Sequence, residues 1–166
     1  VLVLSSNSKA YALERARQNG IETVVLPRRQ YSSTEEYDQA LLKVMQEQRI
    51  DLIVLAGFMC ILGETFTRVY DRRILNVHPS LIPSFCGEGF YGLHVHEAAL
   101  AYGVKVTGAT VHFVNEVTDG GQIILQRAVD VLPGDTPETL QKRVMEQAEW
   151  ELLPRAVAMI CSGEIQ

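Results

Sequence analysis

Short apolar runs alternate with helix-like stretches along the first part of the chain. The runs Val1 to Leu4 and Ile21 to Leu26 are long enough only for buried strands. Between them, Tyr11 to Gln18 has helical periodicity and is followed by Asn19-Gly20, a pair typical of a helix C-terminus. Ser33-Thr34-Glu35-Glu36 has the pattern of a capping box, so a second helix is predicted to begin there.

The alternation continues into the middle of the chain. Asp51 to Gly57 predicts a buried strand, Gly63 to Tyr70 a short helix, and Ile74 to Val77 a fourth strand. Strands that are apolar throughout and alternate with helices are typical of a parallel sheet covered on both faces. The sequence therefore predicts the α/β class, with an open, mostly parallel sheet and helices on both faces.

The pattern changes in the second half. A predicted helix, His94 to Tyr102, is followed by two longer apolar stretches, Val106 to Val114 and Gln122 to Val131. A loop rich in turn residues joins these two predicted strands, which favours an antiparallel or mixed edge of the sheet. Thr136-Pro137 predicts the start of a last helix, because threonine caps well and proline suits the first helical position.

Composition narrows the class of protein. A length of 166 residues with 47% hydrophobic residues fits one domain, residues 1–166, with its own core. A net charge of -5 argues against nucleic acid as a partner. The apolar runs are too short to cross a membrane, and Cys60, Cys86 and Cys161 are too far apart for a CxxC motif. We expect a soluble cytoplasmic protein with free thiols.

Asn76 and His78 stand where the strand Ile74 to Val77 ends. Ligands of open α/β sheets bind beyond the carboxyl ends of the strands. An asparagine amide donates to a developing oxyanion, and a histidine exchanges protons with a nitrogen, so the pair suits acyl transfer. An equally good interpretation is that both side chains only satisfy backbone groups at the strand end.

Asp119 lies in the loop segment Thr118 to Gly121. A carboxylate brought to His78 would fix the tautomer of the ring and favour its protonated form. Taken alone, an Asp-Gly pair is more simply explained as a turn. Only a joint pattern that includes Asn76 and His78 favours a catalytic role.

The remaining histidines do not predict a metal site. His94 and His96 are two positions apart and lack the spacing of a zinc motif. His112 alternates with apolar residues along a predicted strand, which indicates a core-edge or surface position. Cys60 has no basic neighbour in the sequence, so we interpret it as structural or pocket-lining.

Three blocks carry a family resemblance: Leu55 to Met59, Ile74 to Pro83, and His112 to Gly121. In their content and order the chain resembles the folate-dependent formyltransferases, and the resemblance covers nearly the whole chain. His78 is followed by Pro-Ser, as in phosphoribosylglycinamide formyltransferase. The methionyl-tRNA enzyme has His-Ala-Ser and the formyltetrahydrofolate deformylase His-His-Ser at this place.

The resemblance implies an activity and a set of residues. A formyl group would move from the cosubstrate 10-formyltetrahydrofolate to the amine of glycinamide ribonucleotide, in purine biosynthesis and without a metal. The implied catalytic residues are Asn76, His78 and Asp119. The residues implied to contact the folate are Met59, Cys60, Ile61, Leu62, Asn76 and Val114, and those implied to contact the substrate are Gly57 and Glu149.

The chain also departs from the family pattern. It begins at what resembles the second strand of the family, about one strand-helix unit late, so we expect an N-terminally incomplete domain without the phosphate loop. Thr34 and Cys60 stand where the family has two arginines, which leaves recognition of the folate tail open. Two alternatives remain: a formyltetrahydrofolate hydrolase, or a non-catalytic module that binds folate or nucleotide. A homodimer is one option for the oligomeric state.

Overall fold

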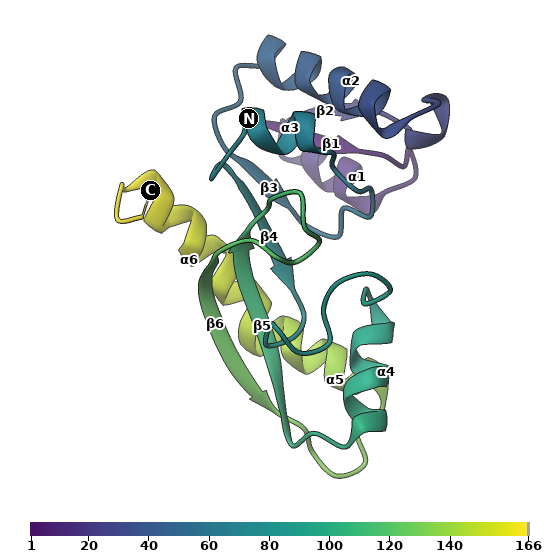
Figure 1. Ribbon diagram of the computed structural model, residues 1–166, viewed down its shortest axis with the longest axis vertical. Coiled ribbons are helices and arrows are strands. Elements are labelled where there is room, and N and C mark those ends of the chain that lie inside the picture. The colour runs from purple at the N-terminus through teal and green to yellow at the C-terminus, as the bar shows by residue number, and fades with distance from the viewer. Residues whose placement is uncertain (166) are drawn as a thin grey trace. The chain divides into compact units, whose positions relative to one another are not determined.

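The computed structural model of the chain describes residues 1–165. Its contacts divide the chain into two compact units, Val1–Ile53 with Gly57–Asp71, and Val54–Ala56 with the chain from Arg72 onward. The helices and strands of both units are labelled in Figure 1. The single domain expected from length and composition stays a prediction.

The first unit contains a parallel pair of strands. β1 (Leu2–Ser5) pairs with β2 (Glu22–Val25). α1 (Tyr11–Gln18) connects them and buries Leu13 and Ala16. The backbone amides at its C-terminus return to the carbonyls of the last turn. The strand-helix-strand order predicted from the sequence is therefore confirmed.

Three further helices belong to this unit: the 3-10 helix η1 (Arg28–Gln30), α2 (Thr34–Glu47) and α3 (Glu64–Val69). The Oγ of Ser33 caps α2 by accepting from the Glu36 amide at 3.1 Å. The Glu36 carboxylate accepts from the amide and hydroxyl of Ser32, so only half of the predicted capping box forms. The apolar face of α2 is buried and includes Tyr37, Leu41, Leu42 and Met45.

The second unit contains a four-stranded sheet with the order β3-β4-β5-β6. Its strands are β3 (Ile53–Leu55), β4 (Ile74–His78), β5 (Val106–Phe113) and β6 (Ile123–Asp130). β5 runs antiparallel to both of its neighbours. The α/β class is confirmed, and so is the antiparallel edge predicted for the two late strands.

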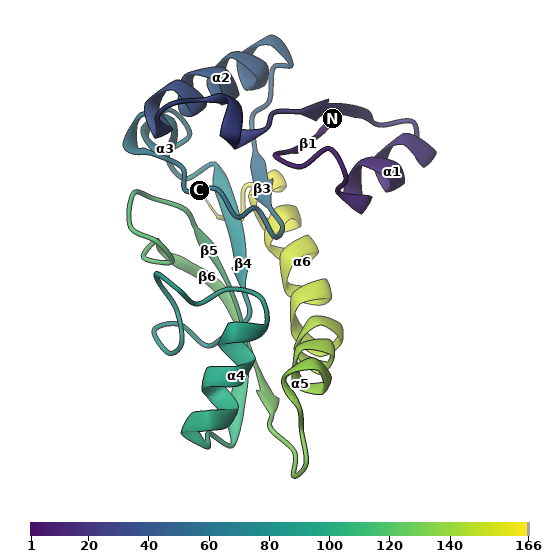
Figure 2. The same ribbon diagram turned by 90° about the vertical axis from the view of Figure 1, so that its right-hand side faces the viewer.

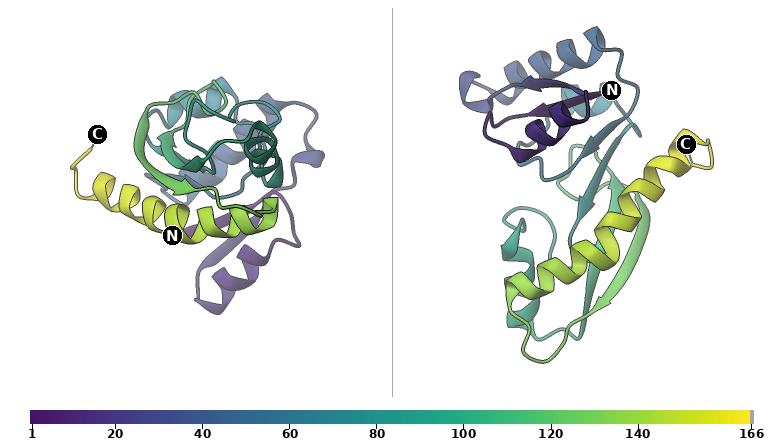
Figure 3. Two further views of the ribbon diagram at one scale, coloured as in Figure 1. Left: turned by 90° about the horizontal axis from the view of Figure 1, so that it is seen from below. Right: turned by 180° about the vertical axis from the view of Figure 1, so that it is seen from behind.

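Helices accompany this sheet. α4 (Leu93–Tyr102) lies beside α5 (Pro137–Val144), while the π-helical turn η2 (Met145–Glu149) leads into α6 (Trp150–Cys161). Figures 2 and 3 show α5, η2 and α6 following one another along the strands. Four apolar residues at four-residue spacing along this stretch are buried: Leu140, Val144, Ala148 and Leu152. No helix among residues 1–165 is long and apolar enough to cross a membrane.

Alternation along β5 separates the two faces of the sheet. Arg127 of β6 stands opposite Ala109 and donates to the Gln147 carbonyl, so this face is turned to the helices. Thr110 belongs to the opposite face, where its hydroxyl accepts from the Ile82 amide. The second face therefore meets the loop after β4, and the site described below lies on it.

A partly buried ion pair closes the connection between β6 and α5. Both carboxylate oxygens of Asp135 lie 2.6 Å from the Arg143 guanidinium, and they also accept from the Leu132 amide and the Thr139 hydroxyl. Replacing Asp135 with asparagine should lower the free energy of unfolding by about 2 kcal/mol at pH 7, because hydrogen bonds to charged groups are lost. Urea unfolding of both proteins measures the difference.

The stability gap should depend on pH in a defined direction. The hydrogen bond from Arg143 holds the pKa of Asp135 well below its usual range. The contribution is therefore complete above the unfolded pKa of about 3.9 and is lost as the pH falls through the lower folded value. A gap between Asp135→Asn and the unchanged protein that stayed constant from pH 7 to pH 2 would contradict this assignment.

Candidate active site

Strand register brings two of the three predicted catalytic side chains, those of Asn76 and His78, together with His112. Asn76 of β4 stands opposite His112 of β5, and His78 stands opposite Thr110. Residues two apart on a strand share a face, so Asn76 and His78 lie beside His112 on the face away from α5 and α6. The Nδ2 atom of Asn76 lies 3.3 Å from Nε2 of His112.

Asp119 lies between two histidines. Its Oδ2 atom is 3.4 Å from Nδ1 of His78, and its Oδ1 atom is 3.5 Å from Nε2 of His112. The Gly87 amide donates to Oδ2 at 2.9 Å. Asp119 has a left-handed φ of 55°, a conformation that aspartate tolerates better than most residues. The loop thus delivers a carboxylate to the histidine predicted from the sequence.

The environment of Asp119 keeps its carboxyl ionised. Burial by itself favours the neutral acid, yet hydrogen bonds from His112 and Gly87 and the nearby histidine charges outweigh it, and the pKa is lowered. The side chain is only 9% exposed, so little water screens these interactions. The site therefore holds a lasting negative charge beside the two imidazole rings.

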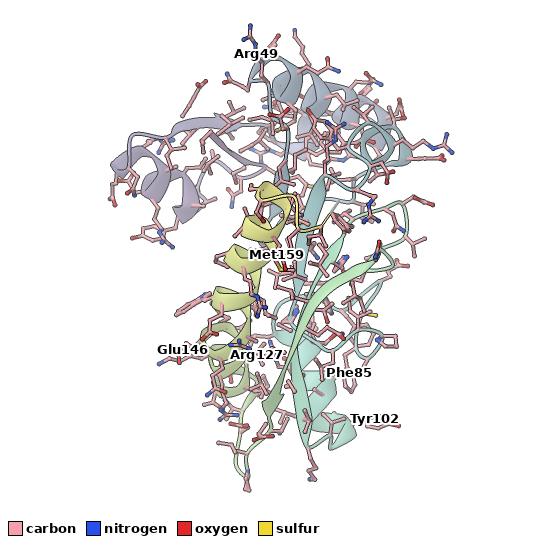
Figure 4. The ribbon with its side chains drawn as sticks, turned by 90° about the vertical axis from the view of Figure 1, so that its left-hand side faces the viewer. Arg49, Phe85, Tyr102, Arg127, Glu146 and Met159 are labelled. Atoms are coloured by element: carbon pink, nitrogen blue, oxygen red, sulfur yellow. The ribbon has the colours of Figure 1, made fainter. Side chains whose placement is uncertain are left out.

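The loop after β4 contacts both His78 and Asp119 through its backbone. The Phe85 carbonyl lies 2.8 Å from Nε2 of His78, so this nitrogen carries the hydrogen that the carbonyl accepts. The Phe85 ring meets the Tyr102 ring with centroids 6.0 Å apart, and both residues are labelled in Figure 4. Burial, together with the Asp119 charge, raises the pKa of the neighbouring Cys86 thiol. Cys86 is therefore a neutral side chain here.

Two buried histidines were not predicted to take part in the site. His112 is a buried residue that contacts Asp119, whereas the sequence had indicated only a core-edge or surface position. His96 of α4 is completely buried, and its ring nitrogens form no hydrogen bond with the residues that the structure describes. Burial and then the charge of His78 lower the pKa of His96 to about 4, so His96 is neutral at pH 7.

The residues implied to line the folate pocket are divided between the two units. Gly57 and the stretch from Met59 to Leu62 belong to the first unit, whereas Asn76 and Val114 belong to the second. Met59 and Ile61 are 60% and 70% exposed, and Leu62 is buried. A shared folate pocket for these residues stays a prediction.

Glu149 and Thr34 are two more positions singled out by the family resemblance. Glu149 ends the π-helical turn η2, and burial raises the pKa of its carboxyl to about 7. Thr34 begins α2 in the first unit, and its hydroxyl accepts from the Arg28 guanidinium at 3.4 Å. These observations do not bear on whether Glu149 contacts the substrate or Thr34 the folate tail. Within residues 1–165, no group of three or more His, Cys, Asp or Glu side chains is arranged to hold a metal ion.

Comparisons with known proteins agree on one family. The formyl transferase model matches residues 1–157. The chain is 40% identical over 164 residues to phosphoribosylglycinamide formyltransferase of Escherichia coli (strain K12), which is 99% of this chain and 74% of that protein. The crystal structure of glycinamide ribonucleotide transformylase 1 from Symbiobacterium toebii superposes with a TM-score of 0.91 at 40% identity, covering 98% of this chain and 74% of that one.

Longer relatives contain the same region. The chain is 46% identical over 166 residues to the trifunctional purine biosynthetic protein adenosine-3 of Gallus gallus. The match covers all of this chain but only 16% of that protein. These matches cover 98 to 100% of this chain. The expectation that a strand and a phosphate loop are missing ahead of Val1 is not borne out by them.

Proposed function

Because this chain belongs to the phosphoribosylglycinamide formyltransferases of the formyl transferase family, we propose that it moves a formyl group from 10-formyltetrahydrofolate to the amine of glycinamide ribonucleotide. The family predicted from the three sequence blocks is confirmed. The proposal for the reaction is supported by one arrangement above all, the Asp119 carboxylate beside His78 with Asn76 on the same strand face. This arrangement is suited to stabilising a tetrahedral oxyanion and moving a proton.

In the proposed reaction, the amine nitrogen of the acceptor attacks the formyl carbon and the carbonyl π electrons move to oxygen. Asn76 and protonated His78 donate hydrogen bonds to this oxyanion. The proton lost by the attacking amine reaches the folate nitrogen by way of His78, the bond from carbon to that nitrogen breaks, and the carbonyl forms again. Asp119 keeps His78 oriented and charged throughout.

The contact between His78 and Phe85 has a consequence for this scheme. Both nitrogens of His78 face acceptors, Nδ1 the Asp119 carboxylate and Nε2 the Phe85 carbonyl. A histidine that hands a proton to substrate must first free one nitrogen, and the carboxylate is the stronger partner. In the proposed reaction, the hydrogen bond between Nε2 of His78 and the Phe85 carbonyl therefore breaks when substrate binds.

The binding assignments are also part of the proposal. Met59 to Leu62, Asn76 and Val114 would contact the folate, while Gly57 and Glu149 would contact the ribonucleotide. The pKa of Glu149, raised to about 7, means that its carboxyl gains a proton as the pH falls below neutrality. Acceptance of ribose hydroxyl hydrogen bonds by a carboxylate would then weaken at lower pH. Cytoplasmic location and a homodimer stay predictions.

The deciding experiment compares acceptors. The full chain is incubated with 10-formyltetrahydrofolate in the presence and absence of glycinamide ribonucleotide, and both formylated product and free formate are measured. We expect formylated product only with the amine present. Formate release without the amine would favour the hydrolase alternative. Folate binding by calorimetry with neither product would favour the non-catalytic module.

A further inference from the structure

We propose that His112 is a positioning residue, whose Nε2 atom orients the Asn76 amide when the ring is neutral and the Asp119 carboxylate when the ring is protonated. The proposal rests on the proposed function, because it assigns how that same site is held. It starts from three contacts of one buried ring, to Asn76, to Asp119 and to the backbone of β5.

The backbone contact fixes the position of one hydrogen. Nδ1 of His112 lies 2.8 Å from the Phe113 carbonyl oxygen, which can only accept a hydrogen bond. Nδ1 therefore carries a hydrogen in both the neutral and the charged ring. In the neutral ring, Nε2 is left as an acceptor, and the protonation of this one atom decides what it offers to Asn76 and Asp119.

Neutral His112 orients the Asn76 amide. Nε2 accepts from Nδ2 of Asn76 at 3.3 Å, which uses one of the two amide hydrogens and leaves the other free for an oxyanion. Without this acceptor, the amide can turn about its last torsion and present its oxygen to the site. An amide oxygen there would repel an oxyanion.

Protonated His112 instead donates to Asp119. Nε2 lies 3.5 Å from Oδ1, while Oδ2 of the same carboxylate serves His78. The His112 side chain is 2% exposed and that of Asp119 is 9% exposed, so little water is at hand to replace the ring. Catalytic hydrogen bonds of this length commonly shorten when substrate binds.

Two substitutions distinguish a positioning role of His112 from a role in packing alone. In His112→Asn, the side-chain amide reaches the Phe113 carbonyl as Nδ1 does, but nothing occupies the place of Nε2. In His112→Gln, the amide reaches Asn76 and Asp119 instead. We expect kcat to fall about 10- to 100-fold in His112→Asn, with KM nearly unchanged, and to stay within about fivefold in His112→Gln.

The matched control is Thr107→Val on the same strand. Thr107 is buried, and its hydroxyl forms no hydrogen bond with the described residues, so an isosteric valine loses no partner. We expect Thr107→Val to leave kcat unchanged. Thermal unfolding of all three variants shows whether any loss of rate follows from a loss of stability.

The pH profile gives a readout that simple packing would not move. The titratable groups facing Asp119 are His78 from β4, His112 from β5 and Cys86 from the loop after β4. His112 helps to lower the pKa of Asp119, so without it the carboxylate takes up a proton at a higher pH. The acid limb of kcat/KM should therefore shift upward in His112→Asn and much less in His112→Gln.

Long-range proton–nitrogen NMR of the full chain tests the geometry without turnover. At a pH where the ring is neutral, His112 should show the Nδ1–H tautomer, and the Asn76 side-chain amide should shift in His112→Asn. Unchanged kcat and pH profile in an active protein, or an Nε2–H tautomer, would overturn the proposal. If the full chain is inactive but the tautomer is as expected, the proposed function fails and with it the catalytic purpose of the positioning, while the contacts assigned to Nε2 of His112 are retained.

Discussion

Replacing Asp119 with asparagine should lower kcat for formyl transfer by roughly 10³- to 10⁴-fold while the fold is kept. Losses of this size follow when the carboxylate that orients a catalytic histidine becomes an amide. Asparagine has nearly the same shape and tolerates the left-handed φ of 55° at this position, so backbone strain does not contribute. Steady-state kinetics together with thermal unfolding measure the two effects separately.

The expected loss of rate follows because the substitution turns one hydrogen-bond acceptor of the side chain into a donor. The carboxylate offers acceptors to His78 and His112 at the same time, at 3.4 and 3.5 Å. An amide offers one acceptor and one donor, so one of the two rings loses its partner and the negative charge disappears. Asp71→Asn, at an exposed aspartate, is the matched control and should retain full activity. Activity of Asp119→Asn within threefold of the unchanged protein would refute the role of Asp119.

Replacing Gly121 with alanine should both destabilise the protein and abolish most activity. A Cβ atom at Gly121 would lie 1.7 Å from the Phe113 carbonyl oxygen, which is backbone and cannot move aside alone. We expect the free energy of unfolding to fall by about 3 kcal/mol, the upper end of the usual cost of overpacking. Urea unfolding gives this value directly.

Activity should fall for a related reason. Gly121 follows Asp119 by two residues, and the Phe113 amide donates to the Gln122 carbonyl at 2.9 Å, so a shift here displaces the loop that holds the carboxylate. Misplacement by 1 Å can cost about 100-fold in rate. Gly120→Ala is the comparison, because its Cβ would first meet the side chain of the exposed Val117. Equal losses in the two variants would contradict the close-approach argument.

Local signals in the sequence predicted the helices and strands well. The N-terminus of α2 follows from Ser33, and the start of α5 follows from Thr136, whose hydroxyl accepts from the Thr139 amide. These signals succeed because capping and apolar spacing act within about one helical turn. Local signals do not predict which strands pair, because hydrogen bonds between strands join residues far apart in the chain.

The place of His112 illustrates what local reasoning misses. Along β5, this histidine stands between the apolar residues Val111 and Phe113, a pattern typical of a core edge or a surface position. Its role depends on standing opposite Asn76, 36 residues earlier in the chain, in the pairing of β4 with β5. No property of the neighbouring residues encodes that register.

The sequence by itself determined the α/β class, the family, and the positions of Asn76 and His78 at the end of a strand. The tertiary structure decided that Asp119 lies between two histidines, and that the Phe85 carbonyl and the Gly87 amide complete their contacts. The reason is physical. A backbone carbonyl or amide is present in nearly every residue, so its part in a site depends only on where folding places it.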